Sequence, residues 1–153
     1  MVVVGAPGEA SSNCSNVPAC TPQTNEADNS AVGAGAAYLY TRTGTQWAKV
    51  AYLKAPNARA GAAFGTAVAI GAGGRFPMIA VGSPGESSNT RFPAPNGGSP
   101  DTSAPGSGAV YTYSLEYRVD FGLETSFWAT KQYIKSPNSD GGDGFGSSVA
   151  LTR

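Results

Sequence analysis

The sequence predicts an all-β chain made of β-propeller blades, each a sheet of four antiparallel strands. Among 153 residues, Gly occurs 21 times and Pro 11 times, which favours short strands joined by turns over long helices. The stretch 64–86, FGTAVAIGAGGRFPMIAVGSPGE, also occurs in part at both ends of the chain. Its second half returns as VVVGAPGE at 2–9, and its first half returns as FGSSVALTR at 145–153. We therefore expect that the chain contains internal copies of one unit and that it begins and ends inside them.

The first copy is expected to contain three strands. A short apolar strand at 2–6 ends at Pro7-Gly8, a pair suited to the middle of a type II turn. A long loop follows at 9–35, rich in Ser, Asn, Ala, Gly and Pro. Strands at 36–40 and 46–53, separated by a turn at 43–45, are expected to form a hairpin.

The second copy opens with an alternating strand at 64–70. Positions 64, 66, 68 and 70 carry the larger side chains, whereas positions 65, 67 and 69 carry only Gly or Ala. The segment 145–151 alternates in the same way. A strand with one face this small is expected where neighbouring sheets approach closely, and the Gly and β-branched residues make a helix the weaker interpretation.

The rest of the second copy repeats the order of the first. A strand at 78–82, the Pro84-Gly85 turn and a loop at 86–106 precede strands at 109–114 and 127–134, with Trp128 at the position of Trp47. The connection between the last two strands is eight residues longer than in the first copy, so Glu116, Asp120 and Glu124 are expected in a solvated loop.

This pattern divides the chain into three parts. Residues 1–56 would be the last three strands of one blade, 57–137 a complete blade, and 138–153 the first strand of the next. A blade needs neighbours to bury its two faces. We therefore expect that the isolated chain is not a stable monomer unless assembly supplies the missing strands.

Charge and composition exclude several classes of function. Ten basic and ten acidic residues cancel, so nothing indicates a nucleic-acid partner or an anionic membrane surface. His is absent, which removes the usual acid–base group and the commonest metal ligand, and we do not expect an enzyme. No apolar run is long enough to span a membrane.

The two cysteines, Cys14 and Cys20, lie in the first long loop. Their spacing allows a small closed loop and matches no zinc or thioredoxin pattern, so a local disulfide is favoured over two free thiols. A disulfide would indicate an oxidising compartment such as the periplasm or the exterior.

Two signatures at corresponding places resemble the FG-GAP repeats of integrin α-subunit propellers and, more closely, bacterial FG-GAP repeat proteins. The signatures are Phe64-Gly65, Phe145-Gly146, Gly5-Ala6-Pro7 and Gly82-Ser83-Pro84. The resemblance implies blades with the Phe-Gly strand innermost and the Trp strand outermost, usually seven to a ring. It also implies calcium in the loop after the Phe-Gly strand of many members.

In this chain that loop, 71–77, has no carboxylate and carries Arg75, so we expect no cofactor here, although calcium is possible in other blades of a parent protein. Asn138, Asp140 and Asp143 form a better oxygen cluster. Because Arg59 and Ala62 replace the two acids in the other copy, turn residues are favoured over a metal site.

The remaining candidates have structural interpretations. Glu9 and Glu86 occupy corresponding positions after Pro-Gly and are expected to cap the turn. The aromatic residues at corresponding positions are expected to pack between blades and not to form a carbohydrate platform: Tyr38, Tyr40, Trp47, Tyr111, Tyr113 and Trp128.

The expected function is that of a secreted or cell-surface FG-GAP propeller that binds a protein or glycan through loops 9–35 and 86–106. Those loops correspond between the copies and should project from one side, with the remaining blades of a parent propeller as further partners. The alternatives are a passive structural array in a large exoprotein and, less favoured, part of a propeller enzyme such as a polysaccharide lyase. The expected location is extracellular, on the cell surface or periplasmic.

Overall fold

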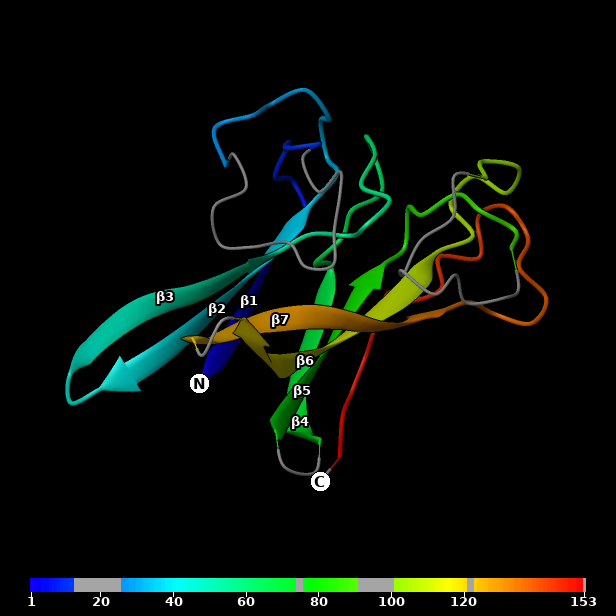
Figure 1. Ribbon diagram of the computed structural model, residues 1–153. Helices are drawn as coiled ribbons and strands as arrows, with labels where there is room; N and C mark the ends of the chain where they lie inside the picture. The colour runs from blue at the N-terminus through cyan, green and yellow to red at the C-terminus, as the bar shows by residue number, and fades with distance from the viewer. Residues whose placement is uncertain (13–25, 74–75, 91–100, 121–122, 153) are drawn as a thin grey trace.

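The computed structural model describes residues 1–12, 26–73, 76–90, 101–120 and 123–152. This part of the chain is all-β and contains no helix (Figure 1). Its seven strands are β1 (Val2–Ala6), β2 (Ala36–Thr43), β3 (Gln46–Leu53), β4 (Ala67–Gly73), β5 (Phe76–Ser83), β6 (Ala109–Asp120) and β7 (Leu123–Ile134). They form two antiparallel sheets that are not closed into a ring, one of three strands and one of four.

The three-stranded sheet has the order β1-β2-β3. Val3 lies opposite Leu39, and the β2–β3 hairpin turns at residues 44–45, where Gly44 adopts a φ of 61°. That left-handed conformation favours Gly, which explains the position of the turn. The predicted strand at 2–6 and the predicted hairpin are confirmed.

The four-stranded sheet runs β4-β5-β6-β7 in chain order. Its first strand begins later than predicted, because Phe64 forms only a parallel bridge to Gly35 and the ladder with β5 starts at Ala67. Phe145 makes the corresponding parallel bridge to Gly108. The strand expected at 145–151 is not formed, since beyond that bridge residues 146–152 pair with no strand in the described part of the chain.

The connection between β6 and β7 is not the long solvated loop that the sequence predicted. Each strand has 12 residues, against eight in β2 and eight in β3. The eight additional residues lengthen the hairpin instead of forming a loop, so Glu116 and Glu124 lie on strands, as does the backbone of Asp120. In the ribbon the long β7 strand crosses in front of the three-stranded sheet (Figure 1).

The core lies where the two sheets face each other. Leu39 and Leu53 of the three-stranded sheet join Ile79, Val81 and the buried aromatic residues of β6 and β7 in one cluster. Phe64 lies within it, with ring centroids 5.5 Å from Tyr111 and 6.2 Å from Tyr113. Burial of these large side chains stabilises the packing of one sheet on the other.

Among the described residues, a helix with the length and apolar character needed to cross a membrane is not found.

Candidate functional site

The two sequence signatures meet at the contact between the sheets. Gly65 donates its backbone N–H to the carbonyl of Gly82 at 2.9 Å, and a Cβ placed on Gly5 would lie 1.9 Å from the carbonyl oxygen of Gly65. The second set repeats this geometry, because a Cβ on Gly82 would lie 1.8 Å from the carbonyl oxygen of Gly146. Both positions therefore require Gly for close backbone approach.

The residues that follow the Gly signature form a turn in each sheet. Glu9 donates its N–H to the carbonyl of Ala6, and Glu86 donates to the carbonyl of Ser83, at 3.1 Å in both cases, so Pro7 and Pro84 lie within four-residue turns. Ser83 is buried and its hydroxyl donates to the carbonyl of Ala62 at 2.7 Å. Neither turn is of type II, because the Gly that follows each Pro does not have the positive φ that type II requires.

Glu86 does more than cap this turn. Its Oε2 accepts the N–H of Ser88 at 3.1 Å, as expected for a cap, and also forms an ion pair with Lys135 Nζ at 2.8 Å. Both side chains of the pair are 1% exposed. Lys135 Nζ also donates to Ser107 Oγ at 2.7 Å, and Asn57 Nδ2 donates to Glu86 Oε1 at 3.2 Å. The two buried charges are therefore both paired and hydrogen-bonded.

The same pair occurs in the three-stranded sheet. Lys54 Nζ lies 2.7 Å from Glu9 Oε2 and donates to the carbonyl of Gly35 at 2.6 Å, while Glu9 Oε1 accepts the N–H of Ser11 at 2.9 Å. Burial lowers the pKa of Lys54, and the nearby Glu9 carboxylate opposes this shift. Each pair ties the start of a long loop to the end of the last strand of its sheet.

Sequence reasoning missed the basic member of both pairs. The signal was present, because LKAPN at 53–57 and IKSPN at 134–138 place Lys54 and Lys135 at corresponding positions, as Glu9 and Glu86 are. A Lys in a turn-rich segment is usually exposed to solvent. Its burial could be predicted only by noticing that a Lys and a Glu recur together at corresponding positions of the two copies.

We call the contacts that join the start and the end of each long loop its loop base. In each loop base, an Asp side chain holds the segment after the Glu next to the segment before the following strand. Asp28 accepts the N–H groups of Ser12 at 2.9 Å and Ser30 at 3.0 Å, and these bonds together with the two Ser hydroxyls lower its pKa to about 2. Asp101 likewise accepts the N–H groups of Asn89 at 2.9 Å and Ser103 at 3.0 Å, which also lowers its pKa. These residues were not singled out from the sequence, although Asp-x-Ser occurs at 28–30 and again at 101–103.

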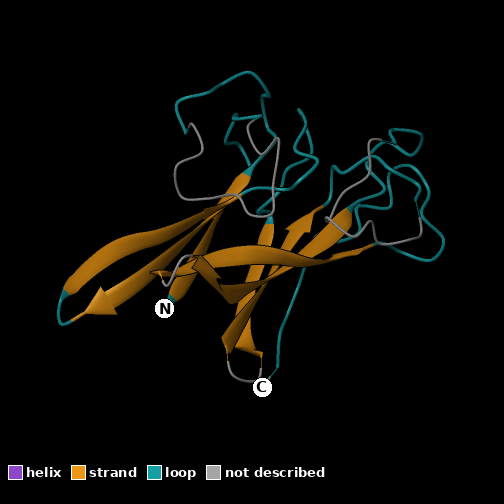
Figure 2. Ribbon diagram, in the orientation of Figure 1, coloured by secondary structure: helices purple, strands orange, loops and turns teal. Residues whose placement is uncertain are grey.

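In each copy, the segment that precedes the Phe-Gly signature forms backbone hydrogen bonds with the end of the long loop. Phe64 and Ala63 donate their backbone N–H groups to Ala34 at 3.1 Å and Gly33 at 2.9 Å. Residues 142–145 make the corresponding bonds to 105–107. The two loop bases thus have the same construction, and both lie at one end of the sheets (Figure 2).

The predicted metal candidates are exposed turn residues in this structure. Asp143 Oδ2 accepts the N–H of Asp140 at 2.8 Å, and Asn138 Oδ1 accepts the hydroxyl of Ser136 at 2.6 Å. Within the described ranges, three or more Asp, Glu, His or Cys side chains do not gather in a way that could hold a metal ion. Cys14 and Cys20 lie outside the described residues.

The aromatic candidates separate into two environments. Tyr111, Tyr113 and Trp128 are buried in the core, and Tyr113 donates its hydroxyl to the carbonyl of Lys54 at 2.8 Å. Burial raises the pKa of Tyr111 and of Tyr113. In contrast, Trp47 is exposed with the Arg42 guanidinium 6.0 Å from its ring, and Tyr38 and Tyr40 are half-buried.

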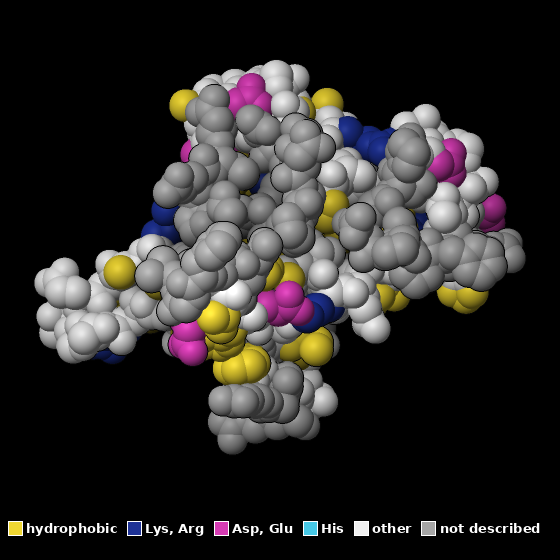
Figure 3. Space-filling model, viewed as in Figure 1, with side chains coloured by type: hydrophobic (Ala, Val, Ile, Leu, Met, Phe, Trp, Pro, Cys, Tyr) yellow, Lys and Arg dark blue, Asp and Glu magenta, His cyan; other side chains and the backbone are white. Residues whose placement is uncertain are grey.

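The arrangement is suited to presenting loops. Its carboxylates are held in ion pairs and turn hydrogen bonds, which fixes backbone geometry. On the face seen in Figure 3, acidic and basic side chains are scattered and do not gather in one strongly charged patch. No family model, curated protein or solved structure matches this chain.

Proposed function

We propose that this chain is part of a secreted or cell-surface β-propeller of the FG-GAP type and acts as a binding or adhesion module. In this proposal the three-stranded and four-stranded sheets are successive blades. The ligand, a protein or a glycan, is contacted by loops 9–35 and 86–106 at one rim.

The observation that carries the proposal is the duplicated loop base. Each long loop leaves its sheet at a Glu whose carboxylate pairs with a buried Lys, and each is closed by an Asp that accepts two backbone N–H groups. Two loops of different length and sequence are thus held on bases of the same design at the same end of the molecule (Figure 2). A rigid scaffold that carries variable loops is the common design of a binding surface.

The test replaces the middle of each loop and keeps the Glu, Lys and Asp residues of the two loop bases. Residues 13–25 and 91–100 are each replaced by a short Gly-Ser linker, singly and together, and attachment to immobilised matrix proteins and to a glycan array is measured. The matched control is a Gly-Ser insertion at the β2–β3 turn, residues 44–45, on another part of the chain. The proposal predicts loss of attachment in the double replacement with unchanged thermal unfolding, and a passive array predicts no change.

A further inference from the structure

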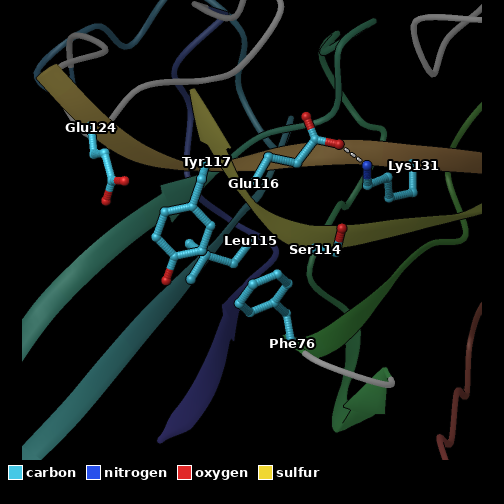
Figure 4. Close-up of a pocket in the computed structure, with 7 residues that line it drawn as sticks. All are labelled: Phe76, Ser114, Leu115, Glu116, Tyr117, Glu124 and Lys131. Atoms are coloured by element: carbon cyan, nitrogen blue, oxygen red, sulfur yellow. Dashed lines mark hydrogen bonds and ion pairs between the residues drawn. The ribbon is translucent and has the colours of Figure 1, made fainter. Parts of the chain in front are cut away.

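The lengthened β6–β7 hairpin opens a cleft that lies away from the loop bases. The β5–β6 ladder ends at the Met78–Ser114 pair, while β6 continues to Asp120. Pro77, which precedes Met78, has no backbone N–H and therefore cannot donate a further hydrogen bond to β6. The cleft at this fork has a volume of about 860 Å³ and is lined by Phe76, Ser114, Leu115, Glu116, Tyr117, Glu124 and Lys131 (Figure 4).

Aromatic and acidic groups converge on this cleft. The rings of Phe76 and Tyr117 lie 5.2 Å apart at an angle of 44°, and Tyr117 is 55% exposed. Glu116 is paired with Lys131, whereas the exposed Glu124 carboxylate, on the same side as Tyr117 in Figure 4, has no ion pair with any described side chain. An exposed aromatic ring beside a carboxylate is a favourable setting for a cationic side chain.

The backbone of β6 adds a second means of recognition. Between Leu115 and Asp120 this strand pairs with β7 on one edge, and among the described residues no strand covers the other edge. An unpaired edge of this kind can accept an extended peptide as an additional strand, with main-chain hydrogen bonds giving affinity and side-chain pockets giving specificity.

We propose that this cleft binds an extended basic peptide segment of a partner protein, which adds to the free edge of β6 and places Lys or Arg side chains against Tyr117 and Glu124. The described part of the first copy has no corresponding extension, because β2 and β3 are each four residues shorter than β6 and β7. This proposal concerns a different surface from the loop rim and does not depend on it.

The test uses the full chain and a labelled peptide of alternating Lys and Val of about eight residues, long enough to span the free edge. Fluorescence anisotropy should show saturable binding that weakens as salt rises. Tyr117→Ala and Glu124→Gln should each weaken binding by about tenfold. The matched controls, Trp47→Ala on β3 and Asp140→Asn in the turn after β7, remove an exposed aromatic ring and an exposed carboxylate away from the cleft and should bind like the wild type.

Three further arms separate the alternatives. A Glu-Val peptide of the same length should not bind, and a Lys-Val peptide N-methylated on alternate residues should lose binding if strand addition is correct. Competition by neutral oligosaccharides would indicate a carbohydrate site and overturn the proposal. Failure of the Lys-Val peptide to bind the wild type at about 1 mM, or binding by both cleft variants as tight as that of the wild type, would overturn it as well.

Discussion

Trp47 and Trp128 occupy corresponding positions in the two sheets and have opposite environments. Trp47 is 53% exposed on β3, whereas Trp128 is 6% exposed on β7. The corresponding tyrosines on the adjacent strands β2 and β6 differ in the same direction, since Tyr38 is half-buried and Tyr111 is fully buried. Trp128 and Tyr111 belong to the core cluster between the two sheets, whereas Trp47 and Tyr38 lie outside it.

Burial of the tryptophan therefore depends on the neighbouring sheet, whereas Tyr52 and its counterpart Tyr133 are buried in both sheets, at 0% and 1% exposure. The loop bases behave differently, because the Glu–Lys pair and the Asp closure are formed in both sheets. Contacts within one sheet and its own loop are therefore present in both copies, whereas contacts between sheets depend on what lies against each face.

The largest expected effect is at the contact between the sheets. Phe64→Ala should lower the free energy of unfolding by about 3–5 kcal/mol, because the ring is fully buried between the sheets and its removal leaves a cavity. Phe145→Ala, at the corresponding half-buried position, should cost clearly less. Urea denaturation of both variants measures the two values, and equal losses would contradict the comparison.

Removal of one partner of the buried pair should have the next largest effect. Glu86→Ala should cost about 3 kcal/mol, because it leaves the Lys135 ammonium buried without its carboxylate. The double variant Glu86→Leu/Lys135→Met should recover much of this loss, since it removes both charges. Denaturation curves provide the test, and a double variant no more stable than the single one would show that the pair is not the source of the effect.

Gly8 and Gly85, at corresponding positions, test whether close approach of two backbone segments requires Gly. A Cβ on Gly85 would lie 1.9 Å from the carbonyl oxygen of Gly61, whereas a Cβ on the corresponding Gly8 would meet no atom within 4 Å. Gly85→Ala should therefore destabilise the fold by about 1–3 kcal/mol through overpacking. Gly8→Ala should be close to neutral in the same thermal unfolding experiment, and a loss as large as that of Gly85→Ala would count against the described packing.

The smallest effect concerns acid pH. Because the pKa of Asp28 is lowered to about 2, its hydrogen bonds stabilise the loop base above the ordinary Asp pKa of about 3.9, and this stabilisation is lost as pH falls through the lowered value. Carboxyl carbon NMR should give a midpoint near 2 for Asp28, with the Ser12 and Ser30 amides titrating together. Asp28→Asn should abolish that amide titration, and a midpoint near 3.9 in the wild type would contradict the loop base.

The sequence predicted those elements whose local signals are strong. Strand β1 and the β2–β3 hairpin follow from apolar runs bounded by Pro7-Gly8 and Gly44, which have clear turn chemistry. The β6–β7 extension was missed because Glu116 and Glu124 suggest a loop, although strand pairing tolerates charges on an exposed arm. The segment 145–151 alternates like a strand but needs a partner strand to form a ladder.

The candidate site was predicted only in part. The positions of loops 9–35 and 86–106 came from composition, and Glu9 and Glu86 from their place after Pro-Gly. Their burial could not be predicted, because it depends on Lys54 and Lys135, which lie 45 and 49 residues further along the chain. The cleft beside Tyr117 depends on the divergence of β6 from β5, which no local pattern encodes.

The two tryptophans of the chain give the most direct test of whether the neighbouring sheet decides burial at their positions. Trp47→Phe leaves Trp128 as the only tryptophan, and Trp128→Phe leaves Trp47. Acrylamide quenching of each variant under native conditions compares the accessibility of the two indoles. We expect blue-shifted, weakly quenched emission from Trp128 and red-shifted, strongly quenched emission from Trp47. Equal quenching of the two indoles would show that the neighbouring sheet does not decide their burial.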